Sequence, residues 1–410
     1  MAQYPTLRRD LQLIPTTVEG RRAILFVDPL QFAPSGLTID MEALPVLQLL
    51  DGRHDLRDIQ TVMMRGQGGR LVPLADVESL LRQLDDSLLL ESDAYRERYR
   101  VLREEFTSLT ERPPSHGGKS YDDDPAALRR FISDSEQSIP PGTPDFGNRV
   151  ISGLVSPHID IRVAGETYIG LYRHLRDRRY DLVVILGINH QWQDGPYCLT
   201  TKNYRTPIGT LPTDADAVEE VKKRVSEGTL ASTDFGHRLE HSIEFQAVFL
   251  SYYLAEPVPV MPILCGGLHE LIMKGDNILQ DRRFREMAEA LRRVIDARKR
   301  VLLVAGVDFS HVGLKFGDPL PAERMIESAR EHDDRLISAL RTGMPEKIVE
   351  NEIAAGGRYN VCGFPALVLF SVLMGKSEGT LLAHETYAEE MTGSAVTYVS
   401  MVFTAQGIAP

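Results

Sequence analysis

The chain contains few of the residues and motifs that mark disulfide-rich, phosphate-binding or zinc-protease proteins. Its 410 residues include only three cysteines, Cys198, Cys265 and Cys362, and no two of them form a CxxC pair. Such an odd and sparse set is typical of a reducing compartment and gives no disulfide framework. No GK[ST] directly follows the glycine-rich stretch 66–69, and no HExxH occurs. A phosphate loop at 66–69 and a zinc-protease helix are therefore not expected.

Excess positive charge and long apolar runs are also lacking. Lys and Arg number 46 against 58 Asp and Glu, and this surplus of acid argues against the phosphate affinity that nucleic-acid binding needs. No run approaches the roughly 18 apolar residues of a membrane-spanning helix. Residues 1–15 have no apolar core ahead of a cleavage site, which argues against a signal peptide. We therefore expect a cytoplasmic protein that binds neither nucleic acid nor membrane.

The length and punctuation of the chain predict more than one domain. Residues 1–95 contain a short apolar strand at 23–27 and two segments, 55–64 and 77–90, whose apolar residues recur at helical spacing. That order predicts a small α+β unit of winged-helix size. Residues 96–125 combine a strongly charged helical stretch with one rich in Pro, Gly, Asp and Ser, which predicts a connector helix and a linker.

Residues 126–410 have the pattern of an α/β domain. Apolar runs of strand length, bounded by Gly, Pro or Asp, alternate with amphipathic helices. Because these runs are continuously apolar, they predict a mostly parallel sheet that is covered by helices on both faces. The runs are 150–155, 182–186, 258–264, 301–307 and 395–403.

Three of these runs end close to a histidine. The first leads into His158, the second into His190, and the fourth into Asp308 and His311. In open α/β sheets ligands bind beyond the carboxyl ends of the strands, so these side chains are expected to converge on one crevice. A single histidine at a strand end is more often a solvated or hydrogen-bonded loop residue. From the residues alone, the two interpretations are about equally supported.

Cys362 is the third candidate ligand. It precedes the apolar helical run 366–373, where the positive end of a helix dipole would favour the thiolate that binds metals. The alternative is a small buried residue at a tight turn. Two imidazoles and a thiolate would form an open site of three protein ligands. The soft sulfur disfavours Mg²⁺ and Ca²⁺ and points to iron, copper or zinc.

Carboxylates and a further histidine occur in the predicted helix 238–250. Glu240 and Glu244 are four residues apart and share one face, with His241 beside them. These groups would either orient metal ligands and shuttle protons, or be incidental charges on a surface helix.

Nine segments follow one another between about residues 114 and 405: SHGGKSY, DPAALRRFI, SPHIDIRVAG, VVILGINH, NYRTPIGTLPTD, EHSIEFQ, GVDFSHVG, VCGFPAL and GSAVTYVSMVF. In this order they resemble the Memo family, and in particular its bacterial members called AmmeMemoRadiSam system protein B. The resemblance implies a fold similar to class III extradiol dioxygenases. It also implies a metal held by His158, His190 and Cys362.

The same resemblance assigns Asp308, His311, Glu240 and His241 to the pocket around the metal. The first hypothesis for function is therefore a redox or oxygen-handling metalloenzyme with iron or copper, and with zinc as the alternative metal. Its substrate would be a small molecule or a peptide, and His311 or His241 would act as acid or base.

Residues 20–92 resemble the small PqqD type of winged-helix module, in the stretch LLDGRHDLRDIQTVM followed by LLRQLDDSLLLES. Such modules resemble recognition elements that bind a peptide as an added strand. A second hypothesis is therefore a non-catalytic accessory protein that binds a peptide or a partner in a radical-SAM-associated system. A third is a hydrolase with zinc and with Glu240 as general base.

Overall fold

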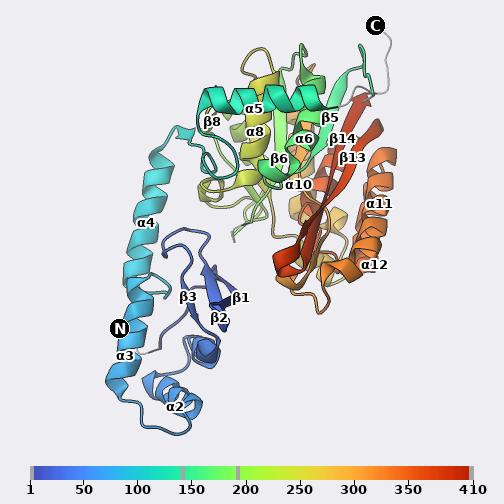
Figure 1. Ribbon diagram of the computed structural model, residues 1–410. Coiled ribbons are helices and arrows are strands. Elements are labelled where there is room, and N and C mark those ends of the chain that lie inside the picture. Colours follow the sequence, from blue (N-terminus) through green and yellow to red (C-terminus); the bar gives the residue numbers. More distant parts are fainter. Residues whose placement is uncertain (1–3, 140–143, 191–193, 406–410) are drawn as a thin grey trace. The chain divides into compact units, whose positions relative to one another are not determined.

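A computed structural model describes residues 4–139, 144–190 and 194–405 of the chain (Figure 1). The contacts between its residues divide the chain into two units, Met1–Ser108 and Leu109–Pro410. The first unit has a hydrophobic core of its own, distinct from the cores of the second. Within the described ranges, no helix is long and apolar enough to cross a membrane.

The first unit combines a three-stranded antiparallel sheet with four helices. Its elements are β1 (Gln12–Val18), β2 (Arg21–Val27), β3 (Thr38–Asp40), α1 (Leu44–Gln48), α2 (Leu56–Gly66), α3 (Leu74–Asp86) and α4 (Asp93–Ser108). The sheet order is β1-β2-β3. Asp55 caps α2 because its carboxylate accepts hydrogen bonds from two backbone N–H groups of the first turn. Phe26, Ile59 and Leu81 illustrate how sheet and helices share one core.

Most of the elements expected in the first unit are found, with two differences. The strand expected at 23–27 lies within β2, and α3 ends at Asp86, earlier than the expected 90, because Leu88 adopts a positive φ of 53° that no helix continues. Strand β1 was not expected from the sequence. It pairs with β2 through a tight turn at Glu19 and Gly20, both at positive φ, and its side chains are only partly buried, so its sequence is not markedly apolar.

The second unit is built on an eight-stranded mixed sheet. Its strands are β5 (Ile151–Ser156), β6 (Leu182–Ile188), β7 (Tyr197–Leu199), β10 (Val260–Cys265), β11 (Val301–Gly306), β12 (His311–Gly313), β13 (Ser377–Glu389) and β14 (Ser394–Ala405). Their order is β12-β14-β5-β11-β6-β10-β7, and β13 pairs with β14. The central strands β5, β11, β6 and β10 are parallel, as their continuous apolar runs predict. The run 395–403, which was expected in a mostly parallel sheet, belongs instead to β14, which is antiparallel to β5.

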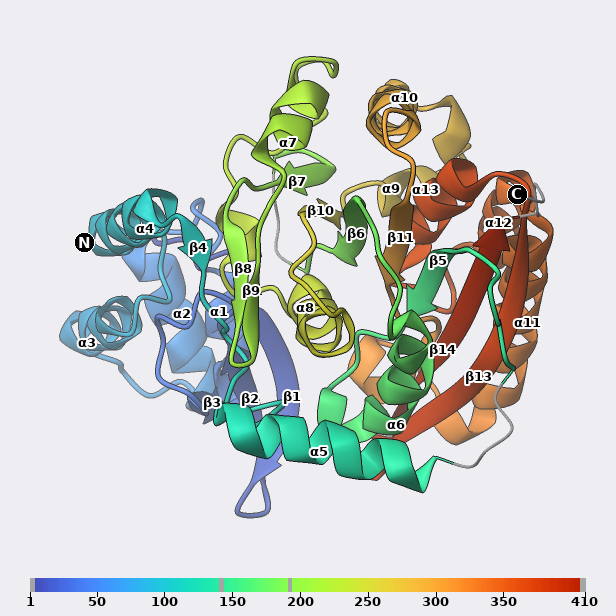
Figure 2. The ribbon, with the colours of Figure 1, turned by 90° about the horizontal axis from the view of Figure 1, so that it is seen from above.

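The central strands are apolar on both faces because helices cover both faces. The helices are α5 (Pro125–Ser138), α6 (Ile161–Tyr172), α7 (Ala215–Lys222), α8 (His241–Tyr253), α9 (His269–Met273), α10 (Arg282–Asp296), α11 (Ile326–Thr342), α12 (Pro345–Ala355) and α13 (Phe364–Met374). In β6, Val184 and Leu186 pack into one core, whereas Val183 and Ile185 pack into the other. Figure 2 shows α10 and α13 on one side of the central strands and α6 and α8 on the other.

Residues 111–124, expected to be a linker because of their Pro, Gly, Asp and Ser content, are packed into the second unit. Arg112 is fully buried and forms an ion pair with Glu244 of α8, which is also fully buried. Tyr121 and Ser115 donate side-chain hydrogen bonds to the same carboxylate. One buried carboxylate thus fixes the path of the segment. A further small sheet joins it to the unit through β4 (Glu111–Arg112), β8 (Asn203–Thr206) and β9 (Gly209–Leu211).

The Arg112–Glu244 pair generates a test of this packing. Replacement of Arg112 by Met should destabilise the second unit by about 3–5 kcal/mol, because it leaves a buried carboxylate without its cation. Urea unfolding followed by circular dichroism measures the change. The matched control is Arg224→Met, which breaks an exposed pair with Glu220 and should leave the unfolding midpoint unchanged. Equal midpoints for the parent and Arg112→Met would contradict the assigned role.

Candidate metal centre

Three parallel strands bring the candidate residues to one edge of the sheet. Because β5, β6 and β11 run in the same direction, their carboxyl ends meet there, and His158, His190 and Asp308 follow these ends by two residues each. The backbone N–H of His158 donates a hydrogen bond of 2.9 Å to the Asp308 carboxylate, which ties the loop after β5 to the loop after β11. This hydrogen bond therefore holds the two loops together at the edge of the sheet.

Cys362 reaches this edge from the turn before α13. Its Sγ lies 3.5 Å from His158 Nε2, and ligand atoms of His158, His190 and Cys362 all lie within 4.8 Å of one another. The next residue, Gly363, has no room for a side chain, since a Cβ there would lie 2.6 Å from Val307. Glycine thus permits the close approach of α13 to the end of β11 that delivers the sulfur.

Hydrogen bonds fix which nitrogen of each candidate ligand is available. His158 Nδ1 lies 3.0 Å from the carbonyl oxygen of Gly306, to which it donates its proton. His190 Nδ1 lies 3.0 Å from the Glu240 carboxylate and donates to it. In each ring Nε2 is therefore the nitrogen left for a metal, once it has lost its own proton. Metal-binding histidines usually donate their other N–H to a carbonyl or carboxylate in this way.

Glu240 connects the candidate ligands to α8. It is the N-cap of that helix and accepts a hydrogen bond from the backbone N–H of Ser242 at 2.9 Å. It also accepts a hydrogen bond from Nδ1 of His190. Burial alone would raise the pKa of Glu240, but His190 and His241 hold that pKa well below its usual range. The residue therefore acts as an ionised acceptor that orients His190.

His241 lies against the candidate ligands and, with His190 and Glu240, forms a second group whose ligand atoms lie within 4.8 Å of one another. Its ring stacks on His190, with centroids 4.9 Å apart, and meets the His158 ring edge-on at 5.3 Å. Burial and the neighbouring imidazoles, against the opposing effect of Glu240, lower the pKa of His241 to about 3. His241 is therefore neutral, with its Nδ1 3.4 Å from Glu240.

Charges in the site favour a thiolate. Burial by itself raises the pKa of Cys362, but the imidazoles of His158 and His311 and the hydrogen bonds from His158 and His190 hold that pKa well below its usual range. Burial would lower the pKa of His158, whereas Asp308 and Cys362 raise it to about 9. Without a metal, the site thus contains a thiolate beside an imidazolium, and a bound cation would take the place of the proton.

The loop that carries Asp308 and His311 is held from two sides. Ser310 donates a 2.6 Å hydrogen bond to the buried Asp333 of α11 and a backbone N–H to Thr397 of β14. His311 Nδ1 donates to the carbonyl oxygen of Phe309 at 2.9 Å, so its Nε2 is the unprotonated nitrogen. Burial raises the pKa of Asp308, and the nearby His158 and His311 imidazoles oppose this rise. The His311 imidazole also helps to hold the pKa of Cys362 low.

Comparison with known proteins shows the family to which the chain belongs. Residues 112–402 match the family described as Memo-like protein. The chain belongs to this family. A MEMO1 family protein of Aquifex aeolicus is 31% identical over 366 residues, which cover 88% of this chain and 91% of that protein. A MEMO1 family protein of Thermus thermophilus is 27% identical, in an alignment that covers 85% of this chain and 98% of that protein.

Each alignment covers more of this Memo-like protein than residues 112–410 make up. Both alignments therefore include part of the first unit. A solved structure, described as an uncharacterized protein from Escherichia coli K12, aligns with 62% of this chain and 99% of its own. Its TM-score is 0.38 and its sequence identity is 14%.

One residue of the Memo-like site was not singled out from the sequence. His116 lies in the segment 111–124, and its ring centroid is 5.4 Å from that of His241. The signal was present in the motif SHGGKSY, but the Pro- and Gly-rich composition around it favoured a linker, in which a histidine has no assigned role. The contacts of this segment with Glu244 place it against α8.

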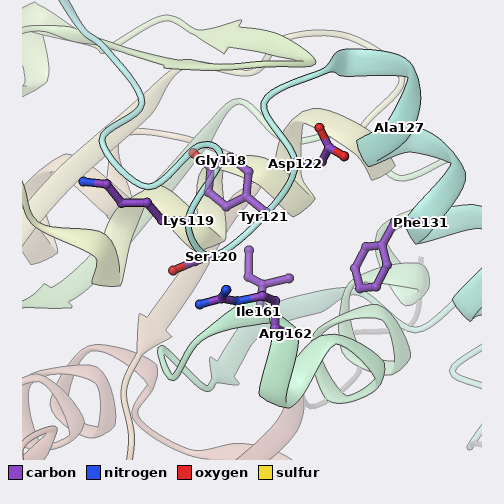
Figure 3. A pocket seen from close by; sticks show the side chains of 9 residues that line it. All are labelled: Gly118, Lys119, Ser120, Tyr121, Asp122, Ala127, Phe131, Ile161 and Arg162. Carbon is purple, nitrogen blue, oxygen red and sulfur yellow. The ribbon is translucent and has the colours of Figure 1, made fainter.

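The loop after His116 also forms one wall of a cavity of about 470 Å³. Figure 3 shows Phe131 of α5 and Ile161 of α6 facing the same space as this loop. Among the described residues, the cavity is lined by Gly118, Lys119, Ser120, Tyr121, Asp122, Ala127, Phe131, Ile161 and Arg162. This lining contains none of the three candidate ligands, so the cavity is separate from the ligand cluster.

The orienting carboxylate of the Memo-like site can be tested by itself. Glu240→Gln keeps the size of the side chain but removes its charge, and zinc binding should weaken about 10- to 100-fold because His190 loses its ionised acceptor. Competition with a chromophoric chelator measures the dissociation constant. Glu270→Gln removes an exposed carboxylate and serves as the control. If Glu240→Gln bound zinc as tightly as the parent, Glu240 would have no orienting role.

Proposed function

We propose that this Memo-like protein holds one transition-metal ion on His158, His190 and Cys362 and uses it in redox or oxygen chemistry. The observation that carries the proposal is the convergence of one possible ligand atom each from His158, His190 and Cys362 within 4.8 Å. Both imidazoles have the tautomer that ligation needs, and the pKa of the thiol is already low. The donor set therefore fits a metal without rearrangement of the protons on Nδ1.

The chemistry of the donors supports iron or copper, with zinc as the alternative. Sulfur and imidazole are poor ligands for Mg²⁺ and Ca²⁺ and good ligands for these three metals. Three protein donors leave room for a further ligand, whereas a structural zinc site is usually closed by four. A bound iron or copper ion would supply an open coordination position and one-electron redox chemistry at this place.

The surrounding residues of the chain would bind, orient and exchange protons. Neutral His241 offers a hydrogen-bond acceptor beside the ligands, and His311 offers an unprotonated Nε2. We assign acid–base work to His311 and hydrogen-bond acceptance to His241, and coordination to neither. Asp308 orients the loop of His158 through its backbone hydrogen bond.

Two other functions are weighed against this proposal. A hydrolase would use Glu240 as general base, but Glu240 already accepts the His190 proton and the Ser242 N–H, and its low pKa makes it a weak base. An accessory protein of a radical-SAM-associated system would bind a peptide through a PqqD-like first unit. In its favour, β1 is an edge strand of the described sheet, and such edges accept an added strand.

The ligand set gives the first test of the proposal. His158→Ala, His190→Ala and Cys362→Ser should each remove most of the metal, because each removes a donor from a three-donor site. The fold should persist, since the two hydrophobic cores of the second unit do not include these side chains. Metal content by mass spectrometry after anaerobic purification, with circular dichroism for the fold, measures both effects. Parent-like metal content in all three variants would refute the ligand set.

Oxygen consumption gives the second test. The reduced iron- or copper-loaded protein should take up oxygen, and His311→Ala should slow the uptake without releasing metal, because His311 is assigned to proton handling. An oxygen electrode and metal analysis of the same samples give both readouts. His54→Ala, which changes an exposed histidine of the first unit, is the matched control. Absence of uptake with either metal would favour the accessory protein.

A further inference from the structure

His116 extends the group of histidines beyond the ligand cluster. The His241 ring lies about 5 Å from the rings of His158 and His190, and the His116 ring lies 5.4 Å from that of His241. The side chain of His158 is only 3% exposed, whereas those of His190, His241 and His116 are 39%, 30% and 23% exposed. His116 is therefore joined to the candidate ligands through the His241 ring, and three of the four rings are partly open to solvent.

The position of His116 is fixed by Glu244. The backbone N–H of His116 donates to this carboxylate at 2.9 Å, and its Nδ1 lies 2.9 Å from Ser115 Oγ and 3.3 Å from Glu244 Oε2. Burial would raise the pKa of Glu244, but Arg112 and His116 hold that pKa far below its usual range, so the carboxylate is ionised. A charged acceptor beside Nδ1 keeps the proton on that nitrogen.

Nε2 of His116 has no hydrogen-bond partner among the described residues, whereas Nδ1 has two. The ring packs edge-on against Phe245 at 5.6 Å, which limits its rotation. A ring held this firmly, with a lone pair on its outer nitrogen, is prepared to accept a hydrogen bond from a ligand.

We propose that His116 is a ligand-binding residue, and that its Nε2 accepts a hydrogen bond from a hydroxyl group of a small molecule held in the metal centre. The matching molecule has an oxygen-donor head for the open coordination position and a hydroxyl group at the end directed past His241. This proposal rests on the proposed metal site, and it names the chemistry of the molecule that the site takes.

Three probes, a parent compound and two derivatives with one added hydroxyl group each, test the proposal. Cobalt-loaded full-length protein is titrated with benzohydroxamate and with its 3-hydroxy and 4-hydroxy derivatives, and the visible cobalt bands give the dissociation constants. In the parent, at least one hydroxyl derivative should bind about three- to tenfold more tightly than benzohydroxamate, the gain expected for one hydrogen bond. His116→Phe should remove this gain and leave benzohydroxamate binding unchanged, because the ring packing against His241 and Phe245 is retained.

Two further variants separate a binding role from a structural one. His116→Gln keeps an acceptor and should retain part of the gain, whereas His54→Phe, at an exposed histidine of the first unit, should retain all of it. A full gain in His116→Phe, or no gain in the parent, would overturn the role of His116. Failure of the parent to bind cobalt would overturn the metal site itself, and with it this proposal.

Discussion

Two buried carboxylates at the start of α8 organise everything around the candidate centre. Glu240 fixes the ring and tautomer of His190, and Glu244, one turn later, fixes Arg112 and the backbone of His116. A buried carboxylate is stable only when charged or hydrogen-bonding donors surround it. The donors that satisfy this requirement come from distant parts of the chain, so the two carboxylates bring these parts to the same helix end.

Contacts within the protein position the candidate ligands. Backbone carbonyls and Glu240 hold the imidazoles, and α13 delivers Cys362 through the close approach of Gly363 to Val307. The pKa values of His158 and His190 are raised and that of Cys362 is lowered. A cation would therefore displace protons from the imidazoles, so metal affinity should rise with pH.

The sequence predicted the parts of this protein that follow from local pattern. Continuous apolar runs predicted the central strands. The rule that ligands bind beyond the carboxyl ends of parallel strands predicted that His158 and His190 lie close together, as they do. A local sequence pattern does not indicate which distant residues a segment contacts. The segment 111–124 has the composition of a linker, and only its pairing with Glu244 makes it part of the site. The direction of β14 was likewise hidden, because an apolar run looks the same in either orientation.

The central claim is that one cation is held by two imidazoles and the Cys362 thiolate. X-ray absorption spectroscopy of the zinc-loaded protein tests it most directly, since sulfur and nitrogen neighbours scatter at different distances. The account predicts one sulfur at about 2.3 Å and imidazole nitrogens at about 2.0–2.1 Å, with the sulfur signal absent in Cys362→Ser. A zinc shell of nitrogen and oxygen only in the parent would contradict the claim, because it would place the ion away from Cys362.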